Sequence, residues 1–324
     1  MRASRLSGRH GGRGAALLVG AVLIALLIAL LAGCAPAGNA AHSPTRAPTA
    51  TTTPTPAPLA HLPPLLAPPP LVSATVAYLV NPTTGVTYYA RNADKEVAMA
   101  STTKIMSALV AITYGNLNQR ITVGADLAQL DGTGASVAGL RVGETLTLRE
   151  LLYALLLPSG DDAAIVIADG VAGSQARFVA LMNLEATLLG MYHTHYANAH
   201  GLDAPGHYTT ARDLTTLTLD ALRSPTFARI VATAEYKLDA TGDHQPYDWK
   251  NTNLLLSTMR YPGADGVKTG YTGNAGDCLV FAANRPTGDL LGVVLGEPDE
   301  TTRFTDAASL LTWGFAVEAE QTAR

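Results

Sequence analysis

The chain has 324 residues with 22 basic and 26 acidic side chains, which gives a formal net charge of -4. So small a charge excludes proteins that bind nucleic acid through many phosphate contacts, since those carry a clear excess of lysine and arginine. The two cysteines, Cys34 and Cys278, exclude a disulfide-rich fold, and we expect no disulfide between them.

The first 34 residues have the pattern of an export signal. Four arginines precede an uncharged apolar run over 15–31, and the run leads into Leu31-Ala32-Gly33-Cys34. This ending resembles the lipobox of bacterial lipoproteins, in which the cysteine receives a lipid and becomes the first residue after cleavage. The alternative is an uncleaved membrane helix, because the run is only a little shorter than the ~20 residues that a span needs. Both predict that the rest of the chain lies outside the cytoplasm, anchored by a lipid on Cys34 or by that helix.

Residues 35–70 are predicted to form a linker. Eleven of the 19 prolines lie there, among threonines and alanines. A segment of this composition buries too little apolar surface to order itself, and it extends as a spacer. We therefore expect three parts: the signal over 1–34, the linker over 35–70 and one folded domain over 71–324.

The folded part begins and ends with strand patterns. β-Branched and aromatic residues over 73–80 and 86–90 flank a turn sequence, which predicts a hairpin. Further strands are expected at 266–269, 278–283 and 290–295. Apolar residues at helical spacing predict helices at 101–114, 148–157, 162–171, 175–189, 211–222 and 300–317. This order predicts an α/β (α+β) fold in which strands from both chain ends form one sheet, covered by helices and interrupted by a helical insert.

The first motif with chemical content is Ser101-Thr102-Thr103-Lys104, at the start of a predicted helix. Side chains three residues apart on a helix share a face, so the hydroxyl and the amine can form a hydrogen bond. A serine becomes a nucleophile when a neighbouring base takes its proton, and lysine can be that base once burial or a nearby cation lowers its pKa. Taken alone, the motif is more typical of a helix N-cap serine with a surface lysine.

A second motif, Ser159-Gly160-Asp161, follows the predicted helix at 148–157. Its hydroxyl could relay a proton between a lysine and a leaving amine. A loop serine that caps the next helix would have the same sequence, so this motif also needs its context.

The third motif is Lys268-Thr269-Gly270, on a predicted strand. A fixed cation and a hydroxyl on a strand edge suit recognition of a carboxylate, and glycine lets another backbone approach. By itself the triplet does not indicate a function.

The three motifs in this order, with their neighbours, resemble the low-molecular-mass D-alanyl-D-alanine carboxypeptidases among the penicillin-recognising serine enzymes. The flanking segments that carry the likeness lie within about 73–295, at 99–106, 139–144, 155–160, 200–203 and 265–272. The motif spacing alone would equally suit a class A β-lactamase. The resemblance implies a β-lactamase/transpeptidase-like fold and a penicillin-binding enzyme that trims peptidoglycan stem peptides without a metal or cofactor.

The resemblance implies a catalytic group in which Ser101 is acylated, Lys104 is its base and Ser159 relays a proton to the departing D-alanine. Asp161 departs from the family pattern, which usually has asparagine at this position. An ionised aspartate only accepts hydrogen bonds, and its charge would hold Lys104 protonated. The conflict is avoided if Asp161 is itself protonated or turns away as a helix cap. Otherwise we expect a low rate or a shifted pH profile.

For substrate binding, the resemblance implies that Lys268 and Thr269 hold the terminal carboxylate, with Gly270 beside them. The backbone amides of Ser101 and Tyr271 would form the oxyanion hole, which stabilises the negative charge of the tetrahedral intermediate.

Two other groups of residues invite an interpretation that the sequence does not support. His193, His195, His200 and His207 lie close together, but without carboxylate or cysteine ligands at regular spacing we expect no metal site. Cys278, on an apolar strand, is expected to be a buried and unreactive thiol.

Two alternative functions remain open. Hydrolysis of β-lactams would need a general base for rapid deacylation. The segment that starts at Glu185 is similar to the motif that carries this glutamate in class A β-lactamases, but it lacks the asparagine at the end of that motif. A catalytically weak, wall-binding lipoprotein would keep the pocket but lose turnover through Asp161.

Overall fold

The structure is a computed structural model that describes residues 68–322 of the chain. The predicted export signal, Cys34 and most of the predicted linker over 35–70 lie outside the described residues, so these expectations stay predictions. The first described residues lead directly into the first strand.

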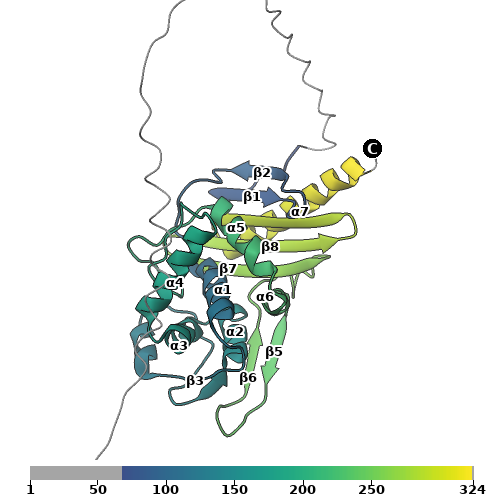
Figure 1. Cartoon of the computed structure of the whole chain (residues 1–324). Helices are drawn as coiled ribbons and strands as arrows, with labels where there is room; N and C mark the ends of the chain where they lie inside the picture. The colour runs from purple at the N-terminus through teal and green to yellow at the C-terminus, as the bar shows by residue number, and fades with distance from the viewer. Residues whose placement is uncertain (1–67, 323–324) are drawn as a thin grey trace, which may run out of the picture. The chain divides into compact units, whose positions relative to one another are not determined.

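Both ends of the described chain contribute to one five-stranded sheet, with the strand order β2-β1-β9-β8-β7 (Figure 1). The early strands are β1 (Val76–Val80) and β2 (Thr87–Arg91), and the late strands are β7 (Ala264–Thr272), β8 (Gly276–Arg285) and β9 (Gly288–Glu297). Every neighbouring pair is antiparallel, and β1 lies beside β9, which joins the two groups. The predicted hairpin and the predicted sheet of distant segments are confirmed.

The sheet separates two apolar cores, because side chains alternate between its faces. On β1, Val76 and Tyr78 belong to the larger core, whereas Ala77 and Leu79 belong to the smaller one. Helix α7 (Glu300–Thr322) packs against the smaller core, and the insert helices lie on the side of the larger core (Figure 1). A sheet buried on both faces is a rigid support for residues on its edge strands.

The insert between the two groups of strands is mainly helical, as predicted. Its helices are α1 (Lys104–Tyr114), α2 (Leu148–Leu156), α3 (Asp161–Ala172), α4 (Gln175–Leu188), α5 (Ala211–Leu222) and α6 (Pro225–Val231). Within the described part of the chain, no single helix has the length and apolarity of a membrane span. The pair α3 and α4, bent by 87°, meets these criteria only when taken together and only by length and composition.

Local side-chain signals explain where individual helices begin. At the start of α2, the Thr147 hydroxyl accepts from the Glu150 amide while the Glu150 carboxylate accepts from the Thr147 amide. This capping box satisfies two amides that the helix cannot pair internally. Helix α6 starts with a Ser224 cap and Pro225 at its first position, where the missing N–H is no loss.

The elements that the sequence analysis did not predict are short. They are the strands β3 (Arg120–Thr122), β4 (Thr145–Thr147), β5 (Glu235–Leu238) and β6 (Tyr247–Lys250), the helix α6, and the 3-10 segments Ala100–Thr103 and Ala125–Leu130. Three or four residues give too little alternation for a strand pattern to stand out. The predicted helix at 101–114 is also corrected, because α1 begins at Lys104 and Ser101 lies in the preceding 3-10 turn.

Asp162, in the first turn of α3, holds a glycine-containing loop against the helix. Its carboxylate accepts hydrogen bonds from the amides of Ala138, Gly139 and Leu140 at 2.8 Å, 3.0 Å and 3.0 Å. Only 2% of Asp162 is exposed, so the bonds replace water that cannot reach these groups. The same loop contacts Asp161, which links this part of the fold to the motif residues.

We therefore expect Asp162→Ala to lower the free energy of unfolding by at least about 3 kcal/mol, because each buried amide without a partner costs ~1–3 kcal/mol. Urea unfolding followed by circular dichroism measures this loss. The control is Asp131→Ala on an exposed loop, which should change stability by less than about 0.5 kcal/mol. Equal stability of the two variants would contradict the role assigned to Asp162.

Candidate active site

Ser101 lies where helix α1 meets the edge strand β7. It belongs to the 3-10 turn Ala100–Thr103, which contacts β7. Two glycines allow this close approach: a Cβ on Gly270 would lie 2.9 Å from the Ser101 nitrogen, and one on Gly201 would lie 2.2 Å from the Ala100 oxygen. Any larger residue at either position would push β7 or the loop that carries Gly201 away from Ser101.

The amine of Lys104 joins three segments of the chain. Its Nζ lies 2.7 Å from Ser101 Oγ, 2.5 Å from Asp161 Oδ1 and 2.6 Å from the carbonyl oxygen of His200. Lys104 is completely buried, so these three acceptors replace the water that an exposed ammonium would bind. Burial lowers the pKa of Lys104 from its usual value, and the negative charge of Asp161 opposes this shift.

A second buried lysine, Lys268, lies on β7. Its Nζ donates to the carbonyl oxygen of Thr269 at 2.9 Å, and Thr269 Oγ1 lies 2.6 Å from Thr252 Oγ1. Burial lowers the pKa of Lys268 well below its usual value, and the positive charge of Lys104 adds to the effect. Two neighbouring amines with lowered pKa values are typical of a functional site.

Asp161 is the first residue of α3, and its carboxylate points toward Lys104. While Oδ1 pairs with that amine, Oδ2 accepts from the Ser136 amide at 3.1 Å, and the Asp161 amide donates to the Ser136 carbonyl at 2.7 Å. The possibility that Asp161 turns away as a helix cap is therefore wrong, and Gly160 is the N-cap residue of α3. A carboxylate that is 2% exposed needs a cation or hydrogen-bond donors in place of water, which explains its direction.

Ser159 lies two residues before Asp161 and has an unusual conformation. Its φ of 65° lies in the left-handed region, which is uncommon for a residue with a Cβ. Its hydroxyl is buried and has no hydrogen-bond partner among the described residues. An unpaired buried hydroxyl costs ~1–3 kcal/mol, so this group is available to hydrogen-bond a bound molecule.

His207 supports the Ser101 turn, a role that no sequence pattern predicts. Its Nδ1 accepts from the Ala197 amide at 3.0 Å, and its Nε2 lies 2.8 Å from Thr103 Oγ1. The nitrogen that accepts from an amide carries no proton, so Nε2 is the donor. Thr103 then donates to the Ala100 carbonyl at 2.7 Å, which fixes the turn. Burial lowers the pKa of His207 to about 4, which keeps the ring neutral.

Arg303, on α7, supports β7 from the other side and was also missed. Its guanidinium donates to the Gly270 carbonyl at 3.1 Å and pairs with Asp277 at 2.7 Å, and 6% of its side chain is exposed. An arginine among charged residues on a predicted helix is expected to be exposed, so only the structure reveals this contact.

The cysteine and the histidines that the sequence singled out lie in different parts of the fold. Cys278 is buried, and burial raises the pKa of its thiol to about 12, which confirms the prediction of an unreactive cysteine. The histidines serve different parts of the fold, since His193 pairs with Glu96 at 3.1 Å and His195 bonds to the Gly206 carbonyl at 2.6 Å.

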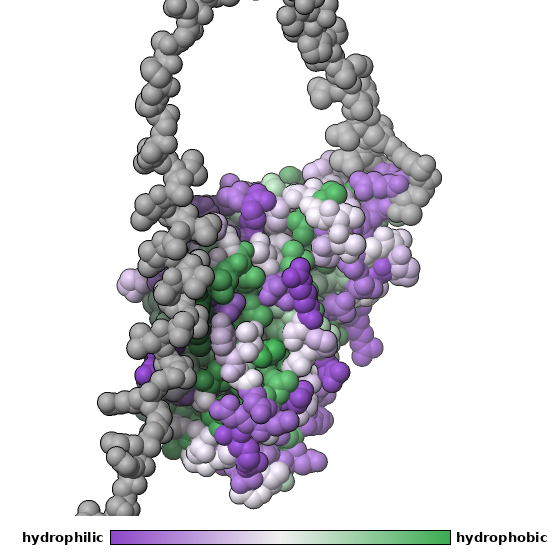
Figure 2. All heavy atoms as spheres, viewed as in Figure 1, coloured by the Kyte–Doolittle hydropathy of each residue, from purple (hydrophilic) through white to green (hydrophobic). Residues whose placement is uncertain are grey.

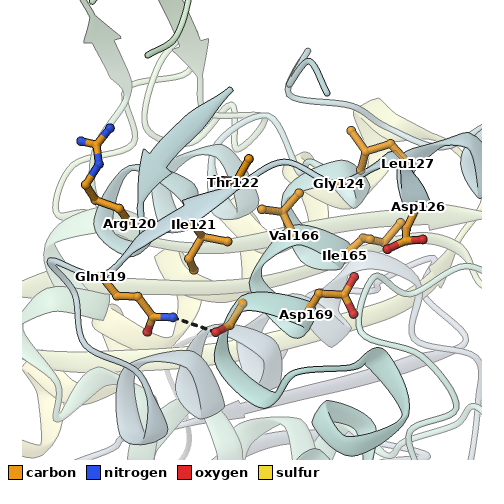
Figure 3. A pocket seen from close by; sticks show the side chains of 11 residues that line it. Gln119, Arg120, Ile121, Thr122, Gly124, Asp126, Leu127, Ile165, Val166 and Asp169 are labelled. Carbon is orange, nitrogen blue, oxygen red and sulfur yellow. Dashed lines mark hydrogen bonds between the residues drawn. The ribbon is translucent and has the colours of Figure 1, made fainter. Parts of the chain in front are cut away.

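A cavity of about 440 Å³ opens beside Tyr271 and Leu202, next to the motif residues. Two other cavities have none of the predicted site residues in their walls. One, of about 310 Å³, has Asp126 and Asp169 at one end and Arg120 at the other (Figure 3). The second, of about 470 Å³, lies between α5 and the sheet, on a face where apolar residues gather toward the centre (Figure 2). Of these three cavities, the first is the one lined by Tyr271, which directly follows the Lys268-Thr269-Gly270 motif.

The sequence pattern of the D-alanyl-D-alanine carboxypeptidase family matches residues 65–299. The chain belongs to this family of serine peptidases. It is 41% identical over 261 residues to a D-alanyl-D-alanine carboxypeptidase from Streptomyces sp. (strain K15), covering 76% of this chain and 89% of that protein. It is 36% identical over 256 residues to DacC of Escherichia coli, covering 76% of this chain and 62% of that longer relative.

Solved structures agree with the family assignment. The crystal structure of the Streptomyces K15 DD-transpeptidase matches with a TM-score of 0.73 and 37% identity, over 77% of this chain and 100% of that chain. The predicted family, the serine-peptidase class and the transpeptidase-like fold are confirmed.

Proposed function

We propose that the protein removes the terminal D-alanine from peptidoglycan stem peptides through an acyl-enzyme on Ser101. The proposal is carried by one contact, the 2.7 Å between Ser101 Oγ and the amine of the buried Lys104. The names of the relatives support the reaction, since both curated relatives described above are carboxypeptidases of this kind.

Lys104 acts as the base in its neutral form. A neutral amine has two N–H donors and one lone pair, so it can donate to Asp161 and the His200 carbonyl while it accepts the Ser101 proton. After proton transfer the ammonium donates to all three groups. The same arrangement of heavy atoms therefore serves both protonation states, so the partners of Lys104 need not move when it takes the proton.

The bond changes follow from this arrangement. Ser101 Oγ loses its proton to Lys104 and attacks the carbonyl carbon of the penultimate D-alanine, which gives a tetrahedral intermediate. The C–N bond then breaks, and the proton passes from Lys104 through the unpaired Ser159 hydroxyl to the leaving nitrogen. Water adds to the resulting ester and releases the shortened peptide and free Ser101.

Residues on β7 bind the substrate in this proposal. A carboxylate beside Lys268 restores the charged form of that amine, which burial otherwise disfavours, and Thr269 adds a hydroxyl donor. The amides of Ser101 and Tyr271 form the oxyanion hole, where each donor is worth about 3 to 4 kcal/mol. Because β7 is the edge strand, half of its backbone groups are left unpaired by β8 and are available to a peptide.

The same pocket accounts for the two alternatives. A β-lactam would acylate Ser101 as the peptide does, so the protein is proposed to be penicillin-binding. Rapid hydrolysis of that adduct is not proposed, since Glu185 pairs with Tyr114 on the surface at 2.5 Å instead of facing Ser101. A silent wall-binding lipoprotein would keep this geometry and fail to form an adduct.

The location remains a proposal that rests on the sequence. The arginine-flanked apolar run and Leu31-Ala32-Gly33-Cys34 support export and lipidation of Cys34, with the uncleaved helix as the alternative. Either anchor would hold the domain outside the cytoplasm, where stem peptides are found.

The direct test is release of D-alanine from diacetyl-Lys-D-Ala-D-Ala. We expect turnover by the parent protein and a loss of at least about 1000-fold in Ser101→Ala, because the nucleophile is removed. Mass spectrometry after incubation with penicillin should show the adduct on Ser101. A parent protein that releases no D-alanine and gains no mass would support the silent alternative.

Replacing Asp161 with asparagine tests the electrostatic account. The negative charge of Asp161 raises the pKa of Lys104, so Asp161→Asn should lower that pKa and leave more neutral amine at a given pH. We expect the acidic limb of the acylation rate, measured with a fluorescent penicillin, to move to lower pH. Coincident profiles for parent and variant would show that Asp161 does not control this lysine.

A further inference from the structure

The buried carboxyl group of Glu297 receives no hydrogen bond. Glu297 is the last residue of β9, and only 2% of it is exposed. Neither of its side-chain oxygens accepts a hydrogen bond from a donor among the described residues. A buried carboxylate without donors or a cation is strongly disfavoured, so Glu297 is either neutral or compensated by a ligand.

The group that faces Glu297 is a second carboxyl, that of Asp306 on α7. The two side chains lie within hydrogen-bond reach of each other. Two carboxylates at this separation repel, whereas a carboxyl and a carboxylate form an O–H···O hydrogen bond. Burial and the nearby charge of Asp306 raise the pKa of Glu297 to about 8, so Glu297 is the member of the pair that holds the proton.

Other ionisable groups lie around Glu297 on the neighbouring elements: Asp299 in the turn before α7, Arg91 on β2, and Asp277 and Cys278 on β8. Asp299 adds negative charge, and Asp277 is occupied by its ion pair with Arg303 on α7 at 2.7 Å. Arg91 opposes the shift, but its guanidinium donates to the Val72 carbonyl at 2.6 Å. The Cys278 thiol is neutral, because burial raises its pKa to about 12. These groups leave the shared proton as the interaction that stabilises the pair.

The pair lies where the described chain enters the sheet. The Asp306 carboxylate accepts a hydrogen bond from the Ser73 amide at 2.5 Å. The Thr75 amide donates to the carbonyl of Gly296, the neighbour of Glu297, at 3.3 Å. Segment 72–75 is therefore bound to β9 and α7, the two elements that carry the pair.

We propose that Glu297 and Asp306 share one proton, and that this proton makes the attachment of segment 72–75 and of the start of α7 to β9 sensitive to pH. While the proton is present, the hydrogen bond between the two carboxyls joins β9 to α7. Its loss leaves two negative charges in a buried contact, so the segment and the first turns of α7 separate from β9 more readily. The inference is independent of the reaction at Ser101.

The variant Glu297→Gln tests the proposal, because its amide donates to Asp306 at every pH. In the parent protein, the stability from the shared proton is complete below the ordinary glutamate pKa of 4.5 and is lost as the pH rises to about 8. We therefore expect the melting temperatures of parent and variant to be similar at about pH 5. At about pH 8.5 the variant should melt at least about 4 °C higher than the parent. Scanning calorimetry measures both values.

The matched control is Glu235→Gln on β5. It removes the same charge from a surface pair with Lys237, so it should follow the parent at both pH values. If Glu297→Gln does not fold, Asp306→Asn is the second variant, since it removes the repulsion and keeps an acceptor for the Ser73 amide. Its melting temperature should fall less between about pH 5 and pH 8.5 than that of the parent.

Hydrogen exchange followed by mass spectrometry locates the change. At about pH 8.5, peptides from 72–75 and 300–307 should exchange at least about tenfold faster in the parent than in Glu297→Gln, the equivalent of one pKa unit. The rates should be equal at about pH 5. Comparing the two proteins at the same pH removes the dependence of exchange chemistry on pH.

Two results would overturn the proposal. A constant difference in melting temperature between parent and Glu297→Gln across this pH range would show that the pair holds no proton that is lost near pH 8. A rise in the melting temperature of the parent when Ca²⁺ or Mg²⁺ is added at about pH 8.5, absent from Glu297→Gln, would assign the two carboxyls to a cation in place of a proton.

Discussion

The buried amine of Lys104 is the contact on which the rest of the site depends, because a lysine is stable in this position only if every one of its donors is satisfied. Its three acceptors come from the 3-10 turn at Ser101, the start of α3 at Asp161 and the loop at His200. Burial and the charge of Asp161 shift the pKa of Lys104 in opposite directions. Burial favours the neutral amine that the reaction needs, and Asp161 favours the ammonium.

The fold serves to hold these segments in one place. The sheet fixes β7 beside the Ser101 turn, and a side chain at position 270 would collide with the backbone of that turn. Behind this contact, His207 secures the turn through Thr103, and Arg303 secures β7 through the Gly270 carbonyl. Asp162 ties the loop at 138–140 to α3. The active site is thus a meeting point of distant segments, each held by its own buried polar contact.

Much of this could be predicted from sequence, for physical reasons that differ between elements. The strands β1, β8 and β9 and the helices α2 and α5 have long apolar patterns, and the spacing of Ser101 and Lys104 places both on one side of a turn. The direction of the Asp161 side chain could not be predicted, because an aspartate at this position can either cap the helix or pair with a lysine. His207 and Arg303 each act through two contacts with residues distant in sequence, which leave no periodic trace, and the short β5–β6 pair has too few residues to show alternation.

The role of Lys104 as the base for Ser101 is tested most directly by titrating its amine, with the parent protein labelled with ¹⁵N at lysine side chains and the Lys104 signal identified from Lys104→Arg. Burial in this pocket predicts that the amine loses its proton at a lower pH than a free lysine, whose pKa is about 10.4. A Lys104 signal that stays protonated up to or beyond that value would contradict the claim that this lysine is the base for Ser101.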